Sequence, residues 1–393
     1  MFRIPSRRAL KPALTLFLAL IAALPAPAEL LKSKLGFFVE MPAGFRLVSG
    51  DGSTKYSFTD PNGGMEFDIL CYERGRYPNI DALAEESLVK LGSQGETNAF
   101  VYEGRRAVFA ELGFGINDKK RKGYAVFIDG RAEYSYALLA SAGAEDFEAY
   151  ADFILSCLDA FSIDRAALRS PGPVSQFSLA WPPERKKERE VSLAPMGGPD
   201  AGASSVALPW SDEEAAQEAD TVEREYKVLV AYAKDPDLSQ EAWTRFYRLI
   251  YRESAARLDR LALEAARLLP RDDPTETARR VLAWVQRFVY ERDEKGTDFI
   301  PPLTAAFGAR GDCDSRAVVA SIILERLGID SIILVSREYS HALLGVDVPG
   351  GGQRFERGGK SYLMGETTAK VGLGTIPADM TDRSKWLAIE LGD

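Results

Sequence analysis

Histidine and cysteine are scarce in this chain, which has one histidine and three cysteines among 393 residues. Neither a Cys-x-x-Cys nor a His-Glu-x-x-His pattern occurs, so the common ligand sets of a zinc site are missing. The acidic stretch Asp235-Pro236-Asp237 lacks the ligand repeat of a calcium loop. We therefore expect no metal ion and no cofactor.

A long apolar run is also missing. Residues 13–24 form an apolar stretch that is too short to cross a bilayer, and no other stretch is a better candidate. Basic residues precede this stretch and Ala26-Pro27-Ala28 follows it, so residues 1–28 are expected to be a signal peptide cleaved after Ala28. We expect a periplasmic or secreted protein with no integral membrane segment after cleavage.

The charge balance is acidic. The net charge is −9, and removing the four basic residues of the signal peptide takes it to −13. An acidic surface repels the phosphate backbone, so nucleic acid is not expected as a partner.

Composition divides the rest of the chain into three parts. Residues 29–165 are rich in strand-like alternation and predict an antiparallel α+β accessory domain. Residues 166–211 carry prolines, glycines, serines and a charge run, which predict a mobile interdomain linker. Residues 212–393 begin with helical patterns and end with strands, so the whole chain is expected to be α+β. The expected strands of the first domain are residues 37–41, 55–59, 65–72, 99–102, 107–114, 124–128 and 133–139, its helices are 81–91 and 145–161, and the later helices include 212–233 and 241–269.

The most informative motif is Gly311-Asp312-Cys313-Asp314. A run that is apolar nearly all the way round a helix follows it and ends at Gly328, which predicts a buried helix led by Cys313. A helix N-terminus and a nearby imidazole both lower a cysteine pKa and so favour the nucleophilic thiolate. We interpret Cys313 as a candidate nucleophile, with a small core residue as the alternative.

The only histidine, His341, begins an expected strand, and a later strand at residues 361–364 leads to Glu366. If the two strands are antiparallel neighbours, the start of one lies beside the end of the other, and Glu366 reaches the imidazole. A carboxylate there would fix the tautomer and stabilise the charged ring. Asp347 shares the strand face of His341, but at about 3.3 Å per residue it lies about 20 Å away.

The order of these elements resembles the transglutaminase-like superfamily, which shares a papain-type cysteine hydrolase core. The resemblance covers roughly residues 275–368 and implies that Cys313 is the nucleophile, His341 the base and Glu366 the third member of a triad. The chain has Glu366-Thr367-Thr368 where the family usually has Asp-Pro-Thr, and Leu343 where it has an aromatic residue. More weakly, the layout of residues 29–165 resembles the PsbP-like fold.

This resemblance implies a cysteine-dependent amide hydrolase or acyltransferase that works through a thioester on a peptide or protein substrate, which could belong to the cell envelope. The sequence leaves hydrolysis and transfer both open. A non-catalytic scaffold or peptide-binding module is the alternative. Cys71 lies on an alternating strand face and Cys157 on an apolar helix stripe, so we expect either two core residues or a disulfide.

Overall fold

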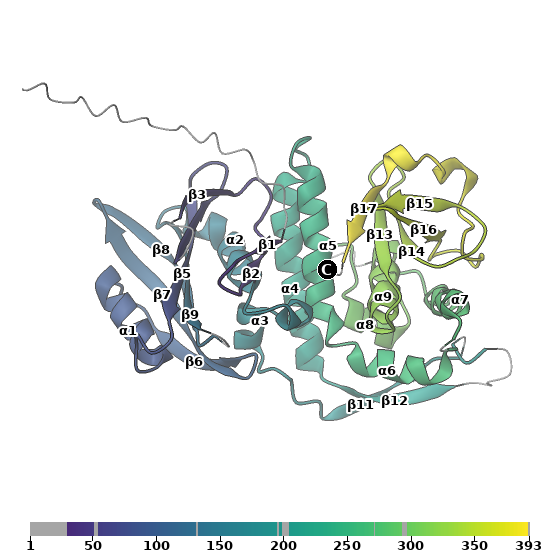
Figure 1. The fold of residues 1–393 in the computed structure, drawn as a ribbon, viewed down its shortest axis with the longest axis horizontal. Helices are drawn as coiled ribbons and strands as arrows, with labels where there is room; N and C mark the ends of the chain where they lie inside the picture. Colours follow the sequence, from purple (N-terminus) through teal and green to yellow (C-terminus); the bar gives the residue numbers. More distant parts are fainter. Residues whose placement is uncertain are drawn as a thin grey trace, which may run out of the picture.

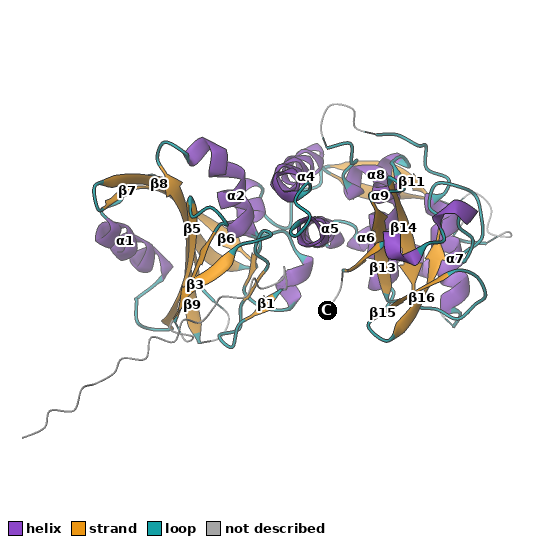
Figure 2. Cartoon of the chain, turned by 90° about the horizontal axis from the view of Figure 1, so that it is seen from above, coloured by secondary structure: helices purple, strands orange, loops and turns teal. Residues whose placement is uncertain are grey.

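The computed structural model describes residues 30–50, 54–130, 133–194, 196–198, 204–270, 272–292 and 297–391. The expected signal peptide, residues 1–28, lies outside these residues. Two lobes lie side by side: the amino-terminal lobe, residues 30–178, and the carboxy-terminal lobe, residues 187–391. The helices α4 (Asp212–Tyr232) and α5 (Ser239–Ala255) stand between them (Figures 1 and 2). The described chain is α+β, as predicted, and all pairs of its named strands are antiparallel.

The amino-terminal lobe is built on a sheet with the strand order β3-β4-β5-β9-β8-β7-β6. Its two faces are covered by α1 (Ile80–Leu91) and α2 (Phe147–Asp159), each of which packs an apolar cluster against the sheet. A small sheet, β1-β2-β10, lies beside it. The remaining elements are β1 (Leu31–Lys32), β2 (Phe38–Val39), β3 (Arg46–Gly50), β4 (Lys55–Thr59), β5 (Met65–Glu73), β6 (Thr97–Tyr102), β7 (Arg105–Ile116), β8 (Lys119–Ile128), β9 (Tyr134–Gly143), β10 (Phe161–Ser162), η1 (Ala166–Arg169) and α3 (Pro173–Ser178).

Cys71 and Cys157 are both buried in the apolar cluster beneath α2, and both are free thiols. Burial raises the pKa of Cys157 to about 12, so this thiol stays protonated at neutral pH. Of the two readings that the sequence left open, the structure has core residues and not a disulfide.

The carboxy-terminal lobe places helices around a second sheet with the order β15-β16-β14-β13-β17. The helix α9 (Cys313–Arg326) packs against β13 and β14, and the apolar side chains on both sides of this contact belong to one core. The other elements are β11 (Lys187–Ser192), β12 (Ser205–Trp210), α6 (Asp259–Leu268), α7 (Pro274–Val285), α8 (Pro302–Gly308), β13 (Ser331–Ser336), β14 (His341–Val346), β15 (Arg354–Arg357), β16 (Lys360–Gly365), η2 (Ala378–Met380), η3 (Arg383–Lys385) and β17 (Leu387–Glu390).

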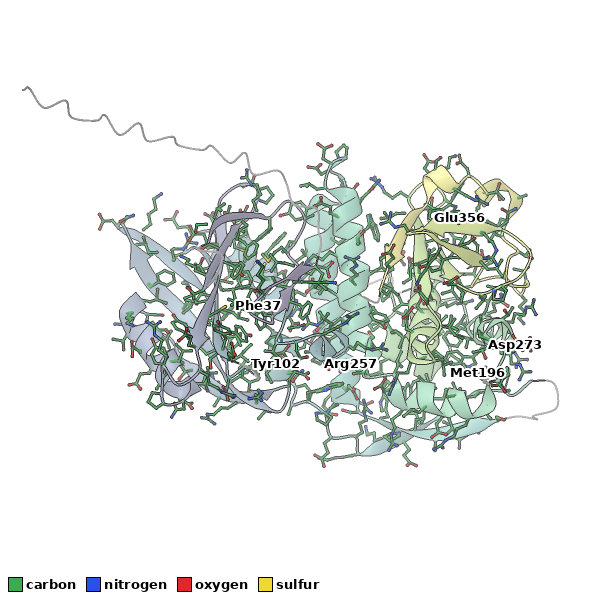
Figure 3. The ribbon with its side chains drawn as sticks, viewed as in Figure 1. Phe37, Tyr102, Met196, Arg257, Asp273 and Glu356 are labelled. Atoms are coloured by element: carbon green, nitrogen blue, oxygen red, sulfur yellow. The ribbon has the colours of Figure 1, made fainter. Side chains whose placement is uncertain are left out.

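The segment expected to be a mobile linker is packed structure over much of its length. Its first part forms η1 and α3, and Val174 of α3 is buried in the amino-terminal core. Its second part forms the hairpin β11-β12, which buries Val191, Leu208 and Trp210 in the carboxy-terminal core. Met196 is also buried there, within the same lobe as the labelled Asp273 (Figure 3). The linker interpretation was wrong because a few well-placed apolar side chains outweigh the polar composition of this segment.

The helix expected at residues 241–269 is two helices. The first, α5, ends at Ala255, and the second, α6, begins at Asp259. Leu258, directly before α6, has a non-helical conformation. The change of direction lets Leu258 and Leu261 pack into the carboxy-terminal core. No glycine or proline marks this break, so helix propensity alone does not reveal it.

Arginines of α4 and α5 make polar contacts with the amino-terminal lobe. Arg245 of α5 is 2% exposed and donates to Glu225 Oε2 of α4 at 2.9 Å, to Ser156 Oγ of α2 at 2.8 Å and to the Glu40 carbonyl at 3.0 Å. Arg224 of α4 donates to Asp159 Oδ2 of the amino-terminal lobe at 2.5 Å. Because Arg224 pairs with Asp159 across the lobe boundary, the lobes are joined by buried contacts and not only by a mobile linker.

Candidate active site

Cys313 is the first residue of α9, and a tight turn brings the chain to it. The Asp312 side chain caps the helix by accepting the Ser315 N–H at 2.8 Å. Gly311 has φ of 155°, and a Cβ at this position would lie 2.9 Å from Ser315 Cβ. The turn therefore requires glycine, and the predicted helix led by Cys313 is present.

His341 and Glu366 are in contact, as predicted. His341 is the first residue of β14 and Glu366 follows the last residue of β16, so the antiparallel pairing brings these ends together. Glu366 Oε2 lies 2.8 Å from His341 Nε2. The other carboxylate oxygen accepts both the N–H and the hydroxyl of Thr368 at 2.6 Å. The rival carboxylate, Asp347, is exposed and lies beyond the far end of β14.

The residues that follow His341 and Glu366 both contact Cys313. The Ala342 N–H is directed at the Cys313 sulfur, and the Thr367 hydroxyl donates to the Cys313 carbonyl at 3.4 Å. The chain neighbours of His341 and Glu366 thus lie against Cys313. Glu366 occupies Nε2 of the imidazole, which leaves Nδ1 as the nitrogen available to the thiol.

The electrostatics at the sulfur are opposite to the expectation from sequence. Cys313 is only 2% exposed, and burial raises the pKa of its thiol well above the usual value. The neighbouring carboxylates of Asp314 and Asp312 raise the pKa further, while the Ala342 N–H opposes them. The helix N-terminus was expected to lower this pKa, but the burial and the two carboxylates outweigh it. The resting thiol is therefore protonated at neutral pH.

Asp314 and Tyr247 complete the surroundings of the thiol, and sequence reasoning assigned neither a role. Asp314 Oδ2 accepts the thiol proton at 3.4 Å, and its other oxygen accepts the Tyr247 hydroxyl from α5. Burial raises the pKa of Asp314, and burial together with the charge of Asp314 raises the pKa of Asp312 to about 7. Asp314 adjoins the cysteine in sequence, whereas no local signal marks Tyr247.

Arg316 links the segments that carry Cys313 and Glu366. Its side chain is 1% exposed and donates to the carbonyls of Gly311 at 2.9 Å, Phe288 at 2.8 Å and Thr367 at 3.1 Å. The first of these carbonyls precedes Cys313 and the last follows Glu366. Sequence reasoning missed this residue because it lies within an otherwise apolar helix.

The glutamate carboxylate is held in its charged form. Burial alone would raise the pKa of Glu366, but the hydrogen bond and charge of His341 and the two donors from Thr368 outweigh burial and hold this pKa at about 2. The side chain of His341 is 13% exposed, so the imidazole reaches the surface. Leu343 lies in an apolar cluster with Met364 and Trp386.

Other kinds of site find little support within the described residues. No group of three or more histidine, cysteine, aspartate and glutamate side chains there is placed to hold a metal ion. In the same part of the chain, none of the helices combines the length and apolar character that crossing a membrane requires.

Comparisons with known proteins give distant structural likeness only. No family model matches the chain, and no curated protein matches it. The chain is similar to the PsbP protein of Synechocystis, with 14% identity over 35% of this chain and 94% of that one, at a TM-score of 0.29. A Pseudomonas aeruginosa protein of unknown function matches with 16% identity over 31% of this chain and 76% of its own, at a TM-score of 0.21. A Bacteroides thetaiotaomicron protein matches with 9% identity over 83% of this chain and 84% of its own, at a TM-score of 0.25.

Proposed function

We propose that the chain is an exported cysteine-dependent enzyme that hydrolyses or transfers amide bonds through a thioester, as the resemblance to transglutaminase-like enzymes implies. Cys313 is the nucleophile, His341 the acid and base, and Glu366 the residue that orients the imidazole. The observation that carries this proposal is the 2.8 Å contact between Glu366 and His341 at the place where their next neighbours contact Cys313.

The chemistry begins with the thiol protonated. As the sulfur attacks the amide carbonyl, its proton passes to His341 Nδ1 and a carbon–sulfur bond forms. The imidazolium is stabilised by the Glu366 carboxylate. The backbone N–H of Cys313 lies in the first turn of α9, where no intrahelical acceptor is available, so it can donate to the developing oxyanion.

The second half of the reaction releases the amine. His341 gives its proton to the leaving nitrogen as the carbon–nitrogen bond breaks, and a thioester on Cys313 remains. Water resolves this thioester in hydrolysis, and an amine resolves it in transfer. In either case the proton of the incoming group passes through His341, and the thiol is regenerated.

One observation favours the alternative of a non-catalytic scaffold or binding module. The Cys313 sulfur is buried and protonated, so substrate reaches it only if the surface above it opens. A scaffold would retain the same hydrogen bonds without such an opening.

Intact-mass analysis separates the two functions. The purified chain is incubated with a panel of peptide amides and glutamine-containing proteins, and the reaction is quenched in acid to retain a thioester. We expect a substrate-derived mass on Cys313 and turnover that falls about 10³-fold or more in Cys313→Ala. Cys71→Ala is the matched control, because Cys71 is also buried and lies in the other lobe. Undiminished turnover in a folded Cys313→Ala variant would remove the cysteine-dependent mechanism, and a wild type with neither adduct nor turnover would favour the scaffold.

Export is the part of the proposal that rests on residues 1–28 alone. A chain produced with this segment in a bacterial host should be recovered outside the cytoplasm with Glu29 as its first residue. Recovery of the full-length chain from the cytoplasm would contradict it.

A further inference from the structure

A cavity of about 470 Å³ lies between the lobes, away from Cys313. Its lining comes from the amino-terminal lobe through η1 and Glu40, from α5, and from the carboxy-terminal lobe through Glu325 and Leu391. The end of the described chain lies beside α5 at this junction (Figure 1). The cavity therefore exists only while the two lobes are docked.

The charge around this cavity is predominantly positive. Four arginines line it, namely Arg165, Arg169, Arg248 and Arg252, against the two carboxyl groups of Glu40 and Glu325. Burial raises the pKa of both glutamates, although arginine charges oppose this, chiefly Arg248 for Glu40 and Arg169 for Glu325. A ligand that enters the cavity consequently meets an excess of guanidinium groups.

Two of these arginines already have acceptors in the protein. Arg252 donates to the carbonyls of Phe161 at 2.7 Å and Ser170 at 3.1 Å. Arg248 donates to the Glu390 carbonyl at 3.0 Å and to Glu40 Oε1 at 3.2 Å. Their positions are fixed by these bonds, so they provide a rigid positive wall.

Two other donors in the lining are buried without an acceptor. Tyr251 is only 3% exposed, and its hydroxyl has no hydrogen-bond partner among the described residues. Nη2 of Arg169 is also buried and has no hydrogen-bond partner among the described residues. The Arg169 guanidinium lies 5.8 Å from the centre of the Tyr251 ring. A buried donor without an acceptor costs folding free energy, and an anion in the cavity would recover it.

We propose that this cavity is a binding site for a monocarboxylate with an apolar body. The carboxylate accepts from Arg169 and Tyr251, since a guanidinium fork matches two carboxylate oxygens. The apolar body lies against Leu30, Leu168 and Leu391. A doubly charged anion such as phosphate is disfavoured because Glu40 and Glu325 face the same space.

A monocarboxylate with an apolar body is either a fatty acid or the carboxy-terminal end of a peptide, and binding measurements distinguish the two. Octanoate represents a fatty acid, N-acetyl-L-leucine represents the carboxy-terminal end of a peptide, and inorganic phosphate is the third probe. The full chain is titrated with each by calorimetry and by thermal unfolding. We expect one of the two carboxylates to bind and to raise the unfolding temperature, with phosphate the weakest of the three.

Substitutions decide whether binding occurs in this cavity. Arg169→Gln should weaken carboxylate binding about tenfold to a hundredfold, and Tyr251→Phe should weaken it several-fold, because each removes one donor. The matched control is Arg106→Gln, an exposed arginine that pairs with Asp81 on the surface of the amino-terminal lobe. Equal carboxylate affinity in the wild type and in both cavity variants, preference for phosphate, or no binding of any probe would each overturn the proposal.

Discussion

Replacing Glu366 by glutamine tests the geometry of the proposed triad most directly. The folded-state pKa of this carboxyl is about 2, against an ordinary value of 4.5. A pKa difference of one corresponds to about 1.4 kcal/mol, so the charged form gains about 3 kcal/mol from its surroundings. Glutamine keeps a hydrogen-bonding oxygen and loses the charge, so we expect about half of this, about 1.5 kcal/mol, to be lost.

The same substitution has a defined dependence on pH. A carboxyl group whose pKa is lowered by folding contributes stability that is fully present above pH 4.5 and disappears as the pH falls toward 2. Glutamine cannot titrate. The free energies of unfolding of the wild type and Glu366→Gln should therefore differ most near pH 6 and converge near pH 2.

Urea unfolding at a series of pH values measures this difference, and the turnover of the same proteins measures its effect on catalysis. We expect a decrease in turnover of about tenfold, since about 1.4 kcal/mol in a barrier is tenfold in rate. Asp347→Asn is the control, because this exposed carboxylate was the rival third member. A stability difference that does not change with pH, or an Asp347 variant with the same loss of turnover, would refute the reasoning.

Three further substitutions have defined outcomes. Asp314→Asn should increase the rate at which iodoacetamide alkylates Cys313 at pH 7 by about tenfold, because one carboxylate that raises the thiol pKa is removed; an unchanged rate would mean that burial alone controls this thiol. Arg316→Met should lower the free energy of unfolding in urea by about 3 kcal/mol or more, since three buried carbonyls lose their donor; a loss below about 1 kcal/mol would contradict the bracing role. Arg245→Met should cost about 3–5 kcal/mol in the same assay, because the buried charge of Glu225 loses this partner; a variant as stable as the wild type would show that this ion pair does not stabilise the fold.

Much of the amino-terminal lobe was predictable because its strands bury one face. The alternation of Met65, Phe67, Ile69 and Cys71 predicts β5, and these side chains are all buried. The strand β3 was not predicted, since all five of its residues are exposed and carry no apolar alternation. Sequence patterns thus identify strands through the core that they face, and not through their hydrogen bonds.

The contact between His341 and Glu366 and the helix led by Cys313 were predictable, and the surroundings of these residues were less so. Cys313, His341 and Glu366 could be selected because a single histidine and a turn before a buried helix are local features. The contacts of Tyr247 and Arg316 depend on which distant segments pack together, and no local pattern shows this. The direction of the Cys313 pKa was also missed, because the depth of burial is a property of the folded chain.

The two helices between the lobes have a consequence for the order in which the chain folds. Glu40 and Asp159 leave the ribosome before Arg224 of α4 and Arg248 of α5, which are their partners in the folded protein. Until those helices emerge, the amino-terminal lobe holds carboxylates that lack their cations and a surface that lacks its cover. We therefore expect nascent chains that end before α4 to remain incompletely folded, and the amino-terminal lobe to reach its final stability only after both helices have been synthesised.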